Sequence, residues 1–344
     1  MPKFLSNTPP RGSSLYISTI LLSILAVLYL ASGFFSATTA PAISDNMFDY
    51  QTVDGYFMQS DPATDPVGPD EKYPVYFDYT KHNFGLIAAD HYPNEGNHLD
   101  YKDRTPWQRF TSFLNALPAT SPPGTQFRLL YLARHGEGYH NVAEAFYGTK
   151  AWDEKWSKLD GNGTSVWSDA HLTATGEQQA RDAGRFMTKQ FSSEIKMPLP
   201  GEWYVSPLTR CLETANLTWD GFNGSSTKPI IKEMVREVMG EHTCDRRSSR
   251  TVIHETMPEW IIEDGFAEED ELWRADHRET WAEHDVRSRA FLDEVFANED
   301  GSKIVSVTAH SGTIASLLRV TGHRKFPLQT GGMMPVFVKA TRTE

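Results

Sequence analysis

The feature that most restricts the fold is an alternation of strand-like and helical segments that begins near residue 127. Segments of strand character lie at Phe127–Ala133, Glu202–Val205, Pro229–Val235, Lys303–Thr308 and Val336–Ala340. Amphipathic helical patterns lie between and after them, at Thr175–Phe191, Leu208–Asn216, Trp281–Phe296 and Gly312–Val320. This alternation is typical of an α/β domain with buried strands in its middle layer. We therefore expect a three-layer α/β/α sandwich over residues 128–344.

An apolar segment lies far upstream of this domain. Leu15–Phe35 is 21 residues long and uncharged, close to the roughly 20 residues that span a bilayer as a helix. Lys3 and Arg11 are the only charged residues before it, so the positive-inside rule places residues 1–14 in the cytosol. We expect an uncleaved signal anchor at 15–35, giving a single-pass type II membrane protein with a lumenal or extracellular domain. A cleaved signal peptide, which would make the protein secreted, is the alternative.

Residues 36–127 form an extension between this segment and the α/β domain. Four prolines between Ser60 and Thr80 oppose long helices and central strands there. Pro106–Leu117 is a candidate short helix, with proline at its start. We expect the extension to wrap over the main domain instead of folding by itself. Candidate glycosylation sequons begin further on, at Asn162, Asn216 and Asn223, as a lumenal domain would carry.

Reactive residues follow the predicted strands where each strand ends. Arg134 and His135 follow the first, Arg210 the second, Glu237 the third and His310 the fourth. Ligands of α/β sheets bind beyond the carboxyl ends of the strands, so these residues are expected to meet. Guanidinium groups bind phosphoryl oxygens, and a neutral imidazole can attack phosphorus. A second histidine can stabilise the transition state, and a carboxylic acid can protonate the leaving group.

Four motifs in this order resemble those of the histidine phosphatase superfamily, also called the phosphoglycerate mutase-like family. They are Arg134–Gly136, the segment Leu172–Ala180 (LTATGEQQA), the segment Ser206–Ala215 (SPLTRCLETA) and Ala309–Gly312. The GEGYHN continuation after His135 and the segment Val235–Arg250 are most similar to a fungal phosphoglycerate mutase-like branch. The resemblance implies the family's α/β/α sandwich over roughly residues 128–340.

The resemblance also implies roles for individual residues. His135 would be the nucleophile that becomes a phosphohistidine, and Glu237 would protonate the leaving group, with Glu137 as the second candidate acid. Arg134, Arg210, His310 and Asn141 would hold the phosphoryl oxygens. Neither a metal nor another cofactor is expected, and the sequence has no HExxH, EF-hand or CxxC pattern.

Three functions fit these expectations. A hydrolase would release phosphate from a phosphorylated small molecule by letting water attack the phosphohistidine. A phosphoglycerate-type mutase would return the phosphate to another hydroxyl and would have to exclude water. A silent binding protein on the same fold is the third. Glu137-Gly138-Tyr139 replaces the Glu-Ser pair typical of true phosphoglycerate mutases, and together with the expected membrane-side location this favours the hydrolase.

Charge and the remaining polar residues add further expectations. The chain has 33 Lys and Arg against 45 Asp and Glu, a net charge of −12, which argues against nucleic-acid partners. Residues 255–300 hold 16 acidic residues and four arginines, and we interpret them as an insertion-like segment, either a solvated helical face or a lid. Arg246, Arg247 and Arg250 either grip a second anionic group of the substrate or belong to a solvated or acid-paired loop. Cys211 and Cys244 either form a disulfide or stay free. His140 is interpreted as a packed loop residue. No pattern in the sequence indicates an oligomeric state.

Overall fold

A seven-stranded mixed sheet organises the protein. The computed structural model describes residues 47–68, 75–93, 95, 101, 103–220 and 227–343. The strand order is β1 (Phe48–Thr52), β7 (Met333–Arg342), β2 (Thr125–Arg134), β6 (Ile304–Ala309), β3 (Glu202–Val205), β4 (Ile230–Ile231) and β5 (Ile261–Ile262). β2, β6, β3, β4 and β5 run parallel to one another, and β7 is antiparallel to both β1 and β2. A mixed sheet with helices confirms the predicted α/β class.

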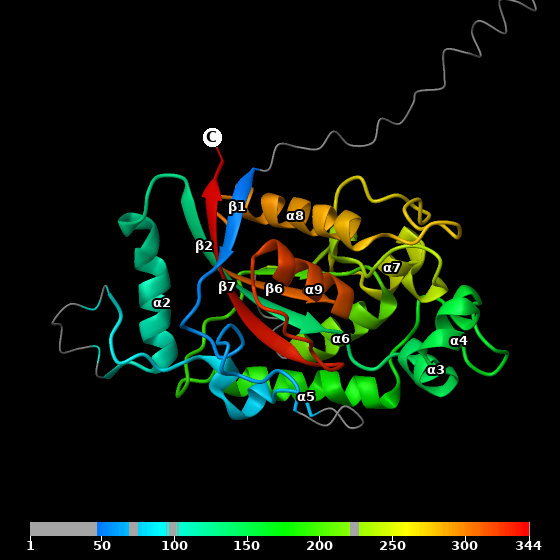
Figure 1. Cartoon of the computed structure of the whole chain (residues 1–344), viewed down its shortest axis with the longest axis horizontal. Coiled ribbons are helices and arrows are strands. Elements are labelled where there is room, and N and C mark those ends of the chain that lie inside the picture. The colour runs from blue at the N-terminus through cyan, green and yellow to red at the C-terminus, as the bar shows by residue number, and fades with distance from the viewer. Residues whose placement is uncertain are drawn as a thin grey trace, which may run out of the picture. The chain divides into compact units, whose positions relative to one another are not determined.

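Helices cover both faces of this sheet (Figure 1). Successive residues of a strand point to opposite faces, and Leu129 and Tyr131 of β2 enter one apolar cluster while Leu130 and Leu132 enter another. α5 and α6 pack in the first cluster, and α8 and α9 pack in the second. The helices are α2 (Pro106–Ala116), α3 (Tyr139–Tyr147), α4 (Thr149–Glu154), α5 (Ala174–Gln190), α6 (Thr209–Trp219), α7 (Arg250–Thr256), α8 (Trp281–Ala297) and α9 (Ser311–Val320).

The strand predicted at Pro229–Val235 is much shorter than expected. Only Ile230–Ile231 pairs with its neighbours, and a 3₁₀ turn, η7 (Glu233–Val235), follows. A side chain takes the place of a neighbouring strand as hydrogen-bond acceptor here, because the Glu263 carboxylate accepts the Glu233 backbone N–H at 2.5 Å. The buried Arg236 then binds Glu233 and Asp270 and holds the turn. The chain therefore leaves the sheet early.

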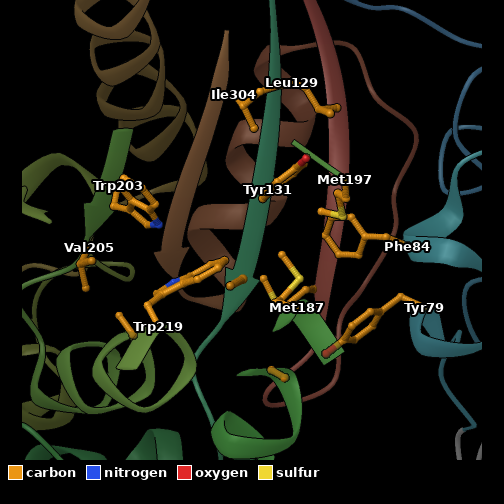
Figure 2. Packing of buried hydrophobic residues seen from close by; sticks show 14 of the residues in the cluster. Tyr79, Phe84, Leu129, Tyr131, Met187, Met197, Trp203, Val205, Trp219 and Ile304 are labelled. Carbon is orange, nitrogen blue, oxygen red and sulfur yellow. The ribbon is translucent and has the colours of Figure 1, made fainter. Parts of the chain in front are cut away.

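The extension contributes to the hydrophobic core. Tyr79 and Phe84 point toward the sheet and α5 (Figure 2). The ring of Phe84 lies 5.2 Å from that of Tyr131 in β2, and the ring of Tyr79 lies 5.1 Å from that of Phe186 in α5. Residues 46–344 accordingly form one compact unit. β1, which the sequence did not predict, also adds the extension to the edge of the sheet.

The acidic segment 255–300 is not an insertion over its whole length. Its second half is α8, which buries Phe291, Leu292, Val295 and Phe296 in the second apolar cluster. The interpretation as a lid is therefore wrong for α8, because an apolar stripe fixes that helix against the sheet, whereas its opposite face is exposed to solvent. Several of the segment's carboxylates pair with arginines, as Asp270 does with Arg236.

The predicted tail at 1–14 and anchor at 15–35 lie outside the residues that the structure describes. Among the helices that it does describe, none is both long and apolar enough to cross a membrane.

Candidate active site

The register of three parallel strands brings the predicted residues together. Arg134 at the end of β2 is paired with Ala309 at the end of β6, so His135 and His310 come next on adjacent strands. Val205, the last residue of β3, lies one position earlier, opposite Thr308. The Ser206 hydroxyl is consequently 2.8 Å from Nε2 of His310. The rings of His135 and His310 are 5.1 Å apart.

His135 is held as a neutral imidazole with one defined tautomer. Its Nδ1 lies 2.7 Å from the Gly136 carbonyl oxygen, and because a carbonyl can only accept, Nδ1 carries the proton. The lone pair is therefore on Nε2. Burial lowers the pKa of His135 well below its ordinary value, and the positive charges of Arg210 and Arg134 lower it further. This is the state that a nitrogen nucleophile requires.

Two arginines supply positive charge beside this imidazole. Burial lowers the pKa of Arg134, but a guanidinium remains charged at physiological pH. Arg210, in the first turn of α6, is 1% exposed and pairs with Asp245 at 2.9 Å. Burial alone would lower the pKa of Arg210, yet the attraction of Asp245 raises it above its ordinary value. Nε of each arginine is buried without a protein partner, so one donor of each guanidinium group is left unsatisfied.

Glu237 is held at the start of α9. Its carboxylate accepts the Gly312 backbone N–H at 3.1 Å and the Ser311 hydroxyl at 3.3 Å. A Cβ on Gly312 would lie 2.0 Å from Oε1 of Glu237, so glycine is what lets the carboxylate approach the helix.

The loop after His135 is packed backbone to backbone against the start of α5. A Cβ on Gly136 would lie 2.4 Å from the Gly176 carbonyl oxygen, and one on Gly176 would lie 2.1 Å from that of Glu137. Thr214 of α6 accepts the Gly136 N–H at 2.9 Å. The glycines in the first and second sequence motifs and the threonine in the third thus hold one loop in place.

A polar pocket of about 390 Å³ joins these groups. Predicted residues among its lining are Arg134, His135, Asn141, Arg210 and Glu237. His310 is fully buried and does not line it, and its ring lies next to that of His135. Other lining residues that the sequence did not assign to the site are His140, Arg278, Trp152 and Trp281. The ring of His140 lies 5.3 Å from that of His135, and the GEGYHN continuation that carries this histidine was the available signal.

Arg278 is the most consequential residue that the sequence did not reveal. It donates to the second carboxylate oxygen of Asp245 at 2.8 Å, while Arg210 holds the first at 2.9 Å. The buried Asp245 thereby fixes two guanidinium groups at one side of the pocket, and Arg278 and Arg210 lower its pKa against the effect of burial. Arg278 lies in the acidic segment 255–300, whose net charge concealed it.

The other predicted arginines lie elsewhere. Arg247 is buried and bonds to Glu233 and to backbone carbonyls, and Arg246 pairs with Asp160. Neither they nor Arg250 line the pocket. Glu137, the second candidate acid, is also outside its lining, since its carboxylate accepts a hydrogen bond from Thr173 at 2.7 Å.

The pocket wall holds one group of metal-ligand type among the described residues, formed by His242, Cys244 and Asp245 within 4.8 Å. Both oxygens of Asp245 already bind guanidinium groups, and burial raises the pKa of the Cys244 thiol. These donors suit cationic side chains better than a metal ion. Cys211 and Cys244 are both buried and free, so the possible disulfide is not formed.

The chain is similar to known proteins over most of its length. Residues 130–331 match the model of the histidine phosphatase superfamily (branch 1). A "Probable phosphoglycerate mutase" of Arthroderma benhamiae is 44% identical over 93% of this chain and 90% of its own length. "Phosphomutase-like protein 3" of Candida albicans is 34% identical over 84% of this chain and 79% of its own.

Among solved structures, a phosphoglycerate mutase from Bacillus anthracis is similar with a TM-score of 0.39 and 18% identity, covering 62% of this chain and 89% of that one. The family model and the fungal relatives establish the assignment. The chain belongs to the histidine phosphatase superfamily, in its fungal phosphoglycerate mutase-like branch.

Proposed function

We propose that the protein is a phosphomonoester hydrolase that works through a phosphohistidine on His135. One observation carries the proposal. A neutral imidazole with its lone pair on Nε2 lines the same pocket as Arg134, Arg210 and Glu237. Two fixed positive charges bind the phosphoryl oxygens, and the carboxyl group is available to the departing oxygen.

The proposed reaction has two steps. Nε2 of His135 bonds to phosphorus while the bond between phosphorus and the ester oxygen breaks, and protonated Glu237 gives its proton to that oxygen. A water molecule then attacks phosphorus, its proton passes to the Glu237 carboxylate, and the bond between nitrogen and phosphorus breaks. Phosphate leaves and His135 returns to its neutral state. The two arginines stabilise the charge in both transition states.

The test is release of inorganic phosphate from p-nitrophenyl phosphate by the purified full-length protein. His135→Ala is expected to lower kcat/KM by about 10³-fold or more, because the nucleophile is lost. His254→Ala, at an exposed position of α7, is the matched control and should retain activity. Equal inactivity of the wild type and His135→Ala on a broad panel of phosphate esters would instead favour the silent binding protein.

A phosphomutase is the second candidate, and the names of the fungal relatives favour it. A mutase must return its phosphate before water reaches the phosphohistidine. The decisive measurement gives the protein 3-phosphoglycerate and follows 2-phosphoglycerate and inorganic phosphate together. Formation of 2-phosphoglycerate well above phosphate release would replace the hydrolase by the mutase.

The proposal includes a location. Leu15–Phe35 would anchor the protein in a membrane with the catalytic domain on the lumenal or extracellular side, as its length and the flanking charges support.

A further inference from the structure

A second cavity, of about 350 Å³, adjoins the phosphate pocket. It lies between α9 and the segment 323–328, and it shares Arg134 and Ser311 with the phosphate pocket. Apolar side chains dominate its lining: Ile314, Ala315, Leu318, Phe326, Pro327 and Leu328. Its size is within the range of small-molecule sites, roughly 300–1,000 Å³. The enzyme therefore has a charged compartment and an apolar one with a common wall.

The common wall is next to the proposed proton donor. The Ser311 hydroxyl donates to the Glu237 carboxylate at 3.3 Å. On the same wall, the Arg134 guanidinium donates to the Leu328 carbonyl at 2.8 Å, and Leu328 lines the apolar cavity. A leaving-group oxygen that receives its proton from Glu237 would lie near this wall. Carbon atoms attached to that oxygen can then enter the apolar cavity, which shares this wall with the phosphate pocket.

Two of the cationic side chains around the cavity, Arg319 and Lys325, are directed to other partners or to solvent. Arg319 is bound by Asp285 of α8, with its Nε 2.9 Å from one carboxylate oxygen and a terminal nitrogen 2.6 Å from the other. Lys325 is exposed to solvent. Tyr76, from the extension, also lines the cavity and lies close enough to raise the pKa of Arg134 against the effect of burial. The extension thus helps to shape the compartment for the leaving group.

We propose that this cavity binds the organic part of the substrate, and that the substrates are phosphate monoesters of alcohols with an apolar body. The inference rests on the proposed function, because it assigns the alcohol side of the ester that His135 and Glu237 would cleave. It places the apolar carbons between α9 and the segment 323–328 while the phosphoryl group stays between Arg134 and Arg210.

Binding of non-hydrolysable alkylphosphonates tests the cavity without turnover. Calorimetry on the full-length protein, at one detergent concentration with a detergent blank, measures Kd from methyl- to hexylphosphonate. Each added methylene is expected to tighten binding about fourfold until the cavity is full, since burying one methylene is favourable by about 0.8 kcal/mol. The same samples are assayed for phosphate release from p-nitrophenyl phosphate.

Two variants locate the effect. Ala315→Phe places a ring in the cavity and is expected to reduce the gain per methylene to less than twofold. Ala315→Leu, a smaller filling, should reduce it partly. Ala297→Phe is the matched control, because Ala297 is exposed at the end of α8 and lines neither cavity, and it should keep the fourfold gain.

A wild-type Kd that does not change with chain length would overturn the inference and leave the hydrolase intact if phosphate release persists. Equal loss of the gain in Ala315→Phe and Ala297→Phe would overturn it as well. Chain-length dependence without phosphate release from any ester would retain the apolar site and refute the proposed function.

Discussion

At the scale of single residues, the site depends on groups whose charge is set by burial and by close neighbours. His135 is kept neutral, Arg210 is kept charged through Asp245, and Glu237 is held at the start of α9. The pKa of His135 is lowered and that of Arg210 is raised within the same pocket, while Glu237 is positioned by hydrogen bonds. Each depends on a specific neighbour, so single substitutions can separate them.

Gly312→Ala is expected to impair proton donation without destabilising the fold. The new methyl group would lie 2.0 Å from Oε1 of Glu237 and displace the carboxylate, whereas alanine is a better helix former than glycine. For an alkyl phosphate, whose leaving group needs a proton, kcat/KM should fall by about 10²-fold or more. The measurement is phosphate release from alkyl and p-nitrophenyl phosphates in parallel.

The p-nitrophenyl ester is the internal control, because its leaving group departs without a full proton transfer. Glu237→Gln should show the same discrimination between the two esters. Equal losses on both esters would mean that Glu237 acts on phosphate binding and not as the acid.

His284 of α8 is expected to make the protein sensitive to acid. It is fully buried, neither ring nitrogen has a hydrogen-bond partner, and burial, with nearby arginines, lowers its pKa to about 2. Below its ordinary pKa of about 6.5 the unfolded chain binds a proton that the folded state refuses. The free energy of unfolding should therefore fall as the pH drops below about 6.5, by up to about 1.4 kcal/mol per pH unit from this residue.

His284→Phe should remove that part of the slope in urea denaturation between pH 6 and pH 4. His254→Phe changes an exposed histidine and should leave the slope as in the wild type. A slope unchanged by His284→Phe would show that the folded state accepts the proton.

At the scale of elements, regular patterns in the sequence were sufficient where an element has a continuous apolar run or buries one periodic face. Glu202–Val205 has the predicted bounds, and Trp281–Ala297 exceeds its prediction by one residue. Prediction failed where tertiary contacts decide. The segment 229–235 has strand character, but side chains from Glu263 and Asp270 hold its second half as a turn. Arg134, His135 and Arg210 could be predicted from strand ends, whereas Arg278 enters the site only because a distant loop meets Asp245.

The extension is expected to unfold together with the catalytic domain. Trp107 of α2 is fully buried, lies 5.9 Å from the ring of Phe57 and donates to Asn83. Trp107→Ala should lower the free energy of unfolding by about 3–5 kcal/mol in one cooperative transition, followed by circular dichroism and by activity.

Phe146→Ala serves as the control, since Phe146 is 79% exposed and its loss should change stability by less than about 0.5 kcal/mol. A separate early transition of the Trp107 variant, with activity retained, would show that the extension is an independent unit.

At the scale of the whole molecule, the net charge of −12 coexists with three arginines in the lining of the pocket, Arg134, Arg210 and Arg278. Arg236 binds Glu233 and Asp270, and Asp245 joins Arg210 to Arg278. An acidic protein can therefore bind a phosphate dianion, since the local arrangement of charges decides the field in the pocket.

The proposed membrane location predicts a glycan on the catalytic domain, with Asn162 as its main site. Asn162 lies in a surface turn, where its side chain accepts the backbone N–H groups of Thr164 and Ser165. Asn216 lies inside α6, and its sequon threonine, Thr218, is buried and donates to the Ala180 carbonyl. Surface loops are the usual acceptor sites, so Asn162→Gln should remove most of a glycosidase-sensitive mass shift, and Asn216→Gln should remove little. Asn223, outside the described residues, is tested in the same way.

Resistance to alkaline carbonate extraction would support the uncleaved anchor, and amino-terminal sequencing would detect cleavage after residue 35. Labelling of the catalytic domain by cytosolic reagents alone, with no mass shift, would contradict the orientation, because the same span cannot place the domain on both sides of the membrane.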